Sequence, residues 1–271
     1  MSGHGGFRHN AQVLRVVDRL ERRSPDYAGL NLTREVRESL LKHEIADDWP
    51  AELEPRPRQP YLEAQVTDLA DSTAYDAHDA EDGLRAGMFD EDEIASCALW
   101  RRARERVEER HRGFLASTSD RNLRIKRLVN ELMKVCINDL IHGSRERIAA
   151  AGIETSDDAR ALREPLLRHT PAIAAEVGEL QRFLYRVFYR HDHLQALTEY
   201  AARVLGALFE SLCARPEEMA AWYRAWADEV GRERAVCDYL AGMTDRFAQR
   251  EFQRLTGCSR DEAEPPVLAR G

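Results

Sequence analysis

Along most of the chain, apolar residues recur at the three- and four-residue spacing of amphipathic α-helices. Alternation with a period of two, which is typical of β-strands, is scarce, and no convincing internal repeat is present. The pattern predicts an all-α protein. Its expected helices cover residues 10–23, 33–44, 62–84, 93–112, 120–148, a short stretch from 156 to 169, 171–189, 194–213, 216–229 and 232–255.

The helix expected at 62–84 has two chemically different faces. At about 100° per residue, its polar face carries Asp71, Tyr75, His78, Asp79 and Asp82. The opposite face carries the apolar and small residues Leu62, Val66, Leu69, Thr73, Ala77, Ala80 and Leu84. This pattern fits a helix with a solvated face as well as a helix that presents a row of metal-binding and hydrogen-bonding groups.

Composition narrows the class of protein. The 271 residues suffice for one large or two modest domains, and a hydrophobic fraction of 43% supports a real core. A net charge of −8 argues against general nucleic-acid binding, which requires a basic surface. The five cysteines are widely spaced and form no CxxC motif, which favours a reducing cytoplasm without disulfides. No apolar run has the length of a membrane span, and no signal-peptide pattern opens the sequence.

Three stretches, taken in order, resemble one known family. They are GGFRHNAQVLRVVDRLE at 5–21, which is followed by GLNLTREVRESLLKHE at 29–44; LEAQVTDLADSTAYDAHDAEDGLRAG at 62–87; and DYLAGMTDRFAQREFQRL at 238–255. Together they resemble the deoxyguanosinetriphosphate triphosphohydrolase-like family of the HD-domain superfamily. The resemblance implies an HD-domain-type helical fold with a C-terminal helical extension. It divides the chain into a partial catalytic core at 1–115, a helical region at 116–256 and a flexible tail at 257–271.

The resemblance also implies an activity. Members of this family hydrolyse a deoxynucleoside triphosphate to the deoxynucleoside and inorganic triphosphate, with a divalent metal. Ala70-Asp71, followed four residues later by Tyr75, matches the last metal ligand of the family, so Asp71 is the expected ligand. A carboxylate in a His/Asp site suits Mg, Mn or Fe.

The same resemblance assigns the sugar contacts. Asp79 is expected to accept a hydrogen bond from the 3′-hydroxyl, and Tyr75 to pack where a 2′-hydroxyl would intrude. His78 is expected to support the metal site by a hydrogen bond and not as a ligand. Taken without the resemblance, Tyr75 also fits a core tyrosine with a satisfied hydroxyl.

Basic residues supply the expected phosphate contacts. His9 matches a family histidine near the phosphates, where it would act as acid or phosphate ligand. Arg124, Lys126 and Arg127 resemble the basic residues that clamp phosphates one helix after the aspartate motif. Their pattern also fits a solvated basic face, and His9 also fits a histidine exposed at a helix start.

One departure from the family changes the expected activity. The family's first histidine ligand and its His-Asp doublet precede the Gly-Gly-Phe stretch, and this sequence begins at Met1 without them. His191-Asp192 is an HD dipeptide, but its context, FLYRHDHLQAL, does not resemble the metal motif. We therefore expect an incomplete metal site and weak or no activity. A misplaced start, a remnant subunit and ligands from another chain are the competing explanations.

Two other functions stay open at the level of sequence. The first is a non-enzymatic helical subunit or nucleotide-binding regulator derived from such an enzyme. The second is an HD phosphodiesterase, which shares the metal chemistry but not the spacing of Tyr75 and Asp79. The expected partners are a deoxynucleoside triphosphate and further copies of the chain in a homo-oligomer, with no membrane partner.

Overall fold

The computed structural model describes residues 3, 6–41, 49–259 and 263–267, and this part of the chain is helical without a β-strand. The expectation of an all-α fold is therefore confirmed. The chain divides into two compact units: residues 33–191, here called the inserted unit, and residues 1–32 with 192–271, here called the split unit. The division at residue 115 that the family resemblance implies falls within the inserted unit and stays a prediction.

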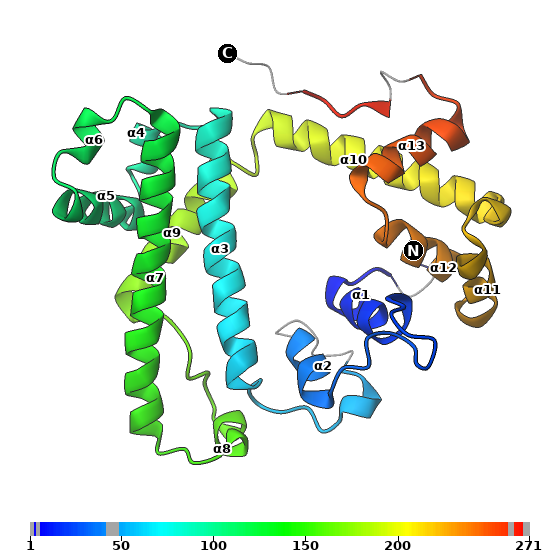
Figure 1. Ribbon diagram of the computed structural model, residues 1–271, viewed down its shortest axis with the longest axis horizontal. Coiled ribbons are helices and arrows are strands. Elements are labelled where there is room, and N and C mark those ends of the chain that lie inside the picture. The colour runs from blue at the N-terminus through cyan, green and yellow to red at the C-terminus, as the bar shows by residue number, and fades with distance from the viewer. Residues whose placement is uncertain (1–2, 4–5, 42–48, 260–262, 268–271) are drawn as a thin grey trace. The chain divides into compact units, whose positions relative to one another are not determined.

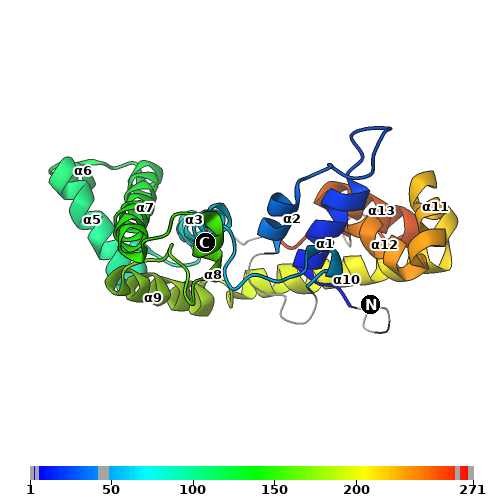
Figure 2. The ribbon, with the colours of Figure 1, turned by 90° about the horizontal axis from the view of Figure 1, so that it is seen from below.

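The inserted unit is built on two long helices, α3 (Leu62–Ala86) and α7 (Arg121–Ala151), which lie side by side in Figure 1. Helix α5 (Ala98–Arg110) packs on α7, and α9 (Pro171–Val187) packs on both α5 and α3. From below, α9 lies on one side of the other three (Figure 2). The shorter elements are α2 (Arg34–Leu40), η3 (Ala51–Leu53), α4 (Glu91–Ile94), α6 (Phe114–Ser117) and α8 (Ser156–Ala161).

Buried apolar side chains from these helices meet in one core. Because Leu84, Trp100, Leu128 and Leu184 come from α3, α5, α7 and α9 and are almost fully buried, they hold the four helices together. The expected start of α7 is confirmed: the Asp120 carboxylate accepts hydrogen bonds from the backbone N–H groups of residues 122 and 123, at 2.9 and 3.1 Å. Gly152, with a φ of 61°, ends the helix.

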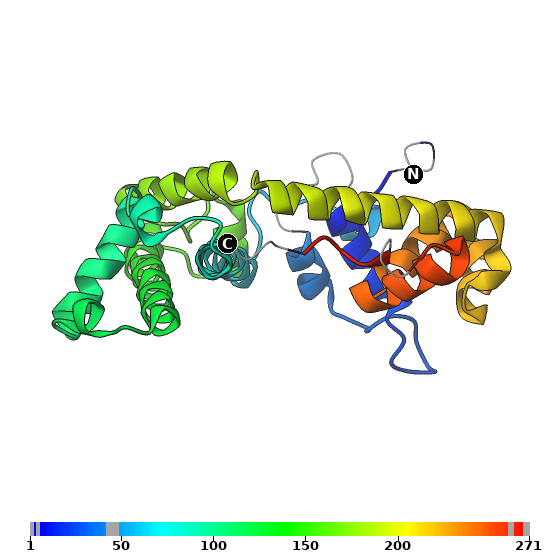
Figure 3. The same ribbon diagram turned by 90° about the horizontal axis from the view of Figure 1, so that it is seen from above.

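The split unit combines an N-terminal segment with five helical elements from later in the chain. The first part is α1 (His9–Arg15), which continues as the π-helix η2 (Val16–Leu20). The second part begins with α10 (Asp192–Ala214), which lies along α12 and α13 in Figure 3. The remaining elements are η4 (Pro216–Glu218), α11 (Ala221–Val230), α12 (Arg232–Ala241) and α13 (Asp245–Thr256).

The core of the split unit lies between α10, α12 and α13. Leu208, Val236 and Phe252 are buried there, together with Ala263 from the segment that was expected to be a flexible tail. The hydroxyl of Tyr200 donates a hydrogen bond of 2.5 Å to the carbonyl of Ala263. Ala263, the first residue of the described segment 263–267, is therefore anchored to the core of the split unit.

Two predicted helices are each divided in the structure. The helix expected at 93–112 is α4 and α5, because a capping box of Asp90 and Glu93 starts the first and the Glu179 carboxylate accepts from the Ala98 backbone N–H at 2.8 Å. The helix expected at 232–255 is α12 and α13, because the Thr244 hydroxyl caps the second.

Other predicted helices differ at their ends. The stretch from 156 to 169 is helical only over α8, and the stretch from 216 to 229 begins as the short η4 and resumes as α11. The expected end of the helix at 33–44 lies outside the described residues. Within them, α2 extends to Leu40. None of the helices described here has the length and apolar character needed to cross a bilayer.

Candidate functional site

Helix α3 displays the row of polar residues expected from its pattern. Thr73, Ala77, Ala80 and Leu84 are buried against the rest of the inserted unit. On the other face Tyr75 is 60% exposed, His78 and Asp82 are exposed, and Asp79 is partly buried. The predicted amphipathic arrangement is confirmed except at Val66, which is 51% exposed.

Asp79 is the one partly buried member of this row, and the other members are exposed. Its Oδ2 accepts a short hydrogen bond from the hydroxyl of Tyr189, which follows α9. Burial raises the pKa of the Asp79 carboxyl above its ordinary value, and the hydrogen bond from Tyr189 partly opposes this effect. Burial raises the pKa of Tyr189, the hydrogen bond to Asp79 and the Asp79 charge raise it further, and the neighbouring Tyr75 acts in the same direction. Tyr189 therefore stays protonated and acts as a donor.

Asp71 lies two turns before Asp79, exposed on the same helix. No group of three or more His, Cys, Asp or Glu side chains is placed to hold a metal ion within the described residues. A divalent cation of the kind the family uses needs several such ligands, and one carboxylate does not hold it. The described side chains therefore do not form a metal centre by themselves.

In the structure, Arg124 and Arg127 contact residues outside this row. Arg124 forms an ion pair with Glu91 at 2.6 Å, and the Arg127 guanidinium lies over the Phe114 ring, 5.8 Å from its centroid. At the start of the same helix, Arg121 donates to the Leu84 carbonyl at 2.6 Å.

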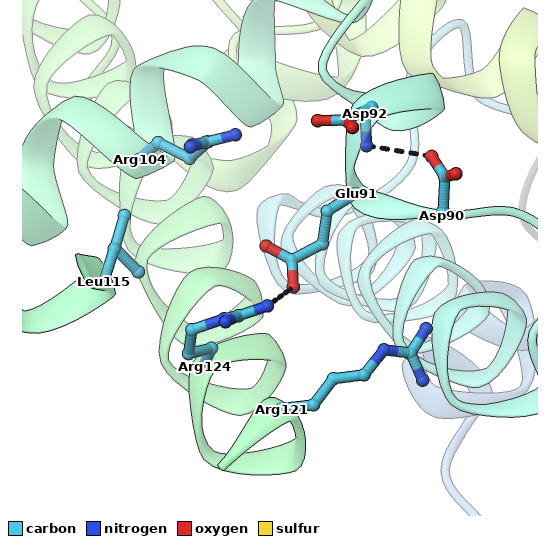
Figure 4. Close-up of a pocket in the computed structure, with 7 residues that line it drawn as sticks. All are labelled: Asp90, Glu91, Asp92, Arg104, Leu115, Arg121 and Arg124. Carbon is cyan, nitrogen blue, oxygen red and sulfur yellow. Dashed lines mark hydrogen bonds and ion pairs between the residues drawn. The ribbon is translucent and has the colours of Figure 1, made fainter. Parts of the chain in front are cut away.

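Arg124 instead lines a polar pocket of about 400 Å³ (Figure 4). Three arginines and three acidic residues balance their charges there, and the Glu91–Arg124 pair occupies its middle in the close-up. The lining consists of Asp90, Glu91, Asp92, Arg104, Leu115, Arg121 and Arg124. The Arg124 guanidinium is thus neutralised by a carboxylate, and its expected phosphate contact stays a prediction.

His9 belongs to the other unit. It is the first residue of α1 and is exposed in the split unit, whereas Asp71, Tyr75 and Asp79 belong to the inserted unit. His9 and the α3 row thus belong to different compact units, and the expected role of His9 near the phosphates stays a prediction.

The split unit contains a buried charge network that pattern analysis did not identify. Asp238 is 1% exposed, and its carboxylate accepts from Gln12 Nε2 at 3.0 Å, Trp226 Nε1 at 2.9 Å and both Nε and Nη2 of Arg15. These contacts join α1 to α11 and α12. Asp238 is the first residue of the third family-like stretch, which begins DYLAGMTD. The family resemblance therefore marked this position, but it did not indicate that the residue is a buried hydrogen-bond acceptor.

Tyr189 was missed for a different reason. It stands in FLYRVFYRHDH, where a tyrosine at the end of an amphipathic helix has no distinguishing spacing. Only the fold brings it to Asp79, 110 residues earlier in the chain.

Comparison with known proteins identifies the chain's relatives. Residues 167–254 match the phosphohydrolase-associated domain. Proteins called deoxyguanosinetriphosphate triphosphohydrolase-like are 40% identical in Geobacter sulfurreducens, 37% in Thiobacillus denitrificans and 36% in Ruegeria sp., each over 94% of this chain. The chain spans 66%, 67% and 70% of the length of these three relatives.

The matched domain begins in the inserted unit, shortly before α9, and ends within α13 of the split unit. The alignments with the relatives cover 94% of this chain and so extend over both units. The chain belongs to the deoxyguanosinetriphosphate triphosphohydrolase-like family.

Proposed function

We propose that this chain belongs to an enzyme that hydrolyses a deoxynucleoside triphosphate to the deoxynucleoside and inorganic triphosphate. The observation that carries the proposal is the row of Asp71, Tyr75 and Asp79 on the accessible face of α3, at successive turns. This spacing matches the family motif, in a chain 40% identical to a relative with this family name.

In this proposal Tyr75 and Asp79 recognise the deoxyribose. Asp79 accepts a hydrogen bond from the 3′-hydroxyl. The Tyr75 ring stands against C2′, where a ribose hydroxyl would be crowded and would lack a partner. Tyr75 is well suited to this role because more than half of its side chain remains accessible.

Asp71 is proposed as one carboxylate ligand of a divalent cation, Mg, Mn or Fe, with His78 supporting it. Since the described residues supply no cluster of ligands around Asp71, we expect little or no turnover by this chain on its own. The same observation favours a second candidate function, that of a non-enzymatic subunit or nucleotide-binding regulator of a related enzyme.

Two further properties are proposed with the function. All five cysteines are free thiols, which favours the cytoplasm as the compartment. A homo-oligomer is proposed because members of the family commonly form oligomers. Sedimentation velocity of the purified chain tests this proposal.

Product analysis with dGTP and Mn²⁺ separates the two candidate functions. Release of deoxyguanosine with triphosphate, even at a low rate, that is lost in Asp71→Ala and kept in Asp82→Ala supports the hydrolase. Asp82 is a suitable control because it is exposed on the same helix face. Saturable dGTP binding without product supports the regulator, and the absence of both contradicts both functions.

A further inference from the structure

The end of α9 is joined to the functional row of α3 through one tyrosine. Tyr189 lies in the turn at 188–190 that follows α9 and donates to Asp79. The turn is fixed by its own backbone: the Tyr189 N–H donates to the Leu184 carbonyl at 3.0 Å, and the His191 N–H donates to the Phe188 carbonyl at 3.0 Å. The backbone position from which the Tyr189 side chain extends is therefore fixed.

Helix α9 is itself anchored before this turn. Its first turn is held by Asp139 of α7, which accepts from the Thr170 hydroxyl at 2.6 Å and from the Thr170 N–H at 2.9 Å. Further along, Gln181 Nε2 donates to Asp76 of α3 at 2.9 Å. Asp76 and Asp79 thus both receive donors from the α9 segment, and its register against α3 is fixed at two points.

A glycine in α3 allows the turn to come this close. A Cβ atom at Gly83 would lie 2.2 Å from Phe89 Cε1 and 3.0 Å from Phe188 Cδ2, so no other residue fits without displacing these rings. Gly83 is one helical turn from Asp79, and Phe188 is next to Tyr189 and packs against its ring with centroids 5.4 Å apart. The packing and the hydrogen bond therefore bring the same turn to the same part of α3.

We propose that Tyr189 is a positioning residue for sugar recognition: its hydroxyl holds Asp79 Oδ2, so that Oδ1 faces the 3′-hydroxyl of a bound deoxynucleotide. The inference rests on the proposed function, because it assumes that Asp79 binds the sugar. Oδ1 of Asp79 accepts no hydrogen bond from the described residues, whereas Oδ2 accepts the hydrogen bond from Tyr189. A carboxylate with one oxygen fixed offers the other in a defined direction, which lowers the entropy lost on binding.

Tyr189→Phe removes only the hydroxyl, and Tyr185→Phe is its matched control. Tyr185 lies in α9, is 58% exposed, and its hydroxyl contacts Arg190 and not the α3 row. Binding of dGTP and of 2′,3′-dideoxy-GTP to the full chain is measured by calorimetry with Mg²⁺. Circular dichroism and urea unfolding verify that each variant folds.

The expected result is a loss that depends on the 3′-hydroxyl. Tyr189→Phe should weaken dGTP binding about fivefold, the effect of one hydrogen bond of about 1 kcal/mol, and change dideoxy-GTP binding less than about twofold. Tyr185→Phe should change neither. In addition, the pKa of Asp79, followed by carboxyl ¹³C resonances, should rise in Tyr189→Phe because a donor to the charged form is lost.

Other results would overturn the inference in distinguishable ways. If wild type prefers dGTP over dideoxy-GTP but Tyr189→Phe keeps this preference, Tyr189 has no positioning role. Equal weakening of both ligands would assign it a structural role only. If wild type binds neither ligand or does not distinguish them, the proposed sugar contact of Asp79 fails before Tyr189 is considered, and the inference fails with it.

Discussion

At the scale of single residues, Asp238 shows how a buried charge is made tolerable. Its carboxylate is fully removed from solvent, yet one arginine, one glutamine and one tryptophan donate to it. A buried ion of this kind is stable only with such partners, and removing its charge leaves the Arg15 guanidinium without a counter-ion. The residue therefore stabilises the split unit and has no part in the proposed chemistry.

Asp238→Asn keeps the shape and removes the charge. Because Arg15 is 28% exposed and regains some solvation, we expect a loss of about 2–4 kcal/mol in the free energy of unfolding. Urea unfolding measures it. Asp228→Asn, at an exposed position of α11, should change the same quantity by less than about 0.5 kcal/mol. A loss below about 1 kcal/mol in Asp238→Asn would contradict the assigned role.

Cys136 offers a second test at this scale. Burial, with added repulsion from Asp76, Asp139 and Glu176, raises the pKa of its thiol to about 12. Since the thiolate is the reactive form, Cys136 should resist a thiol-specific reagent at pH 8 in the folded protein and react in urea. Mass spectrometry of the modified peptides checks this. Rapid labelling of Cys136 in the native protein would show that α7 opens locally.

At the scale of elements, α3 serves the core with one face and the candidate site with the other. Its buried face could be predicted because packing against α7 and α9 requires small or apolar groups at helical spacing. The contact of its polar face with Tyr189 could not be predicted, since it joins two residues that are 110 positions apart and depends on how the chain between them folds. The divided helices were missed because capping by Asp90 and Thr244 competes with a continuous apolar stripe.

Gly83→Ala tests the packing between α3 and the turn after α9. The added methyl group collides with Phe89, so we expect a loss of about 1–3 kcal/mol in the free energy of unfolding, although alanine favours helices. Gly206→Ala in α10 is the matched control, because its Cβ would meet no atom within 4 Å and should stabilise by up to about 1 kcal/mol. Opposite signs for the two variants are the expected outcome, and equal signs would contradict it.

At the scale of the whole molecule, one unit is inserted into the sequence of the other. The inserted unit is continuous and contains its own core, so a fragment of residues 33–191 should fold alone. We expect helical circular dichroism and cooperative urea unfolding for this fragment. The fragment 192–271 should fold poorly, because its Asp238 lacks Gln12 and Arg15. A cooperatively folded 192–271 fragment would show that α1 is dispensable.

Sequence patterns predicted the helical class, the residues of the row on α3 and the family. They did not predict that 1–32 and 192–271 form one unit, since the pairing of Arg15 with Asp238 leaves no local signal. They also gave no sign of the ion pair between Arg124 and Glu91, while the phosphate contact expected of Arg124 stays a prediction. A basic residue on a helix does not reveal from sequence which acid neutralises it.

The pairing of Arg15 with Asp238 also has a consequence for biosynthesis. The two residues are 223 positions apart, so α1 leaves the ribosome long before its buried partner exists. The inserted unit can fold during that interval, whereas the N-terminal segment must wait unpaired. The split unit is therefore expected to form last during translation, and a ribosome that stalls before residue 238 would hold a folded inserted unit beside an N-terminal segment open to chaperones and proteases.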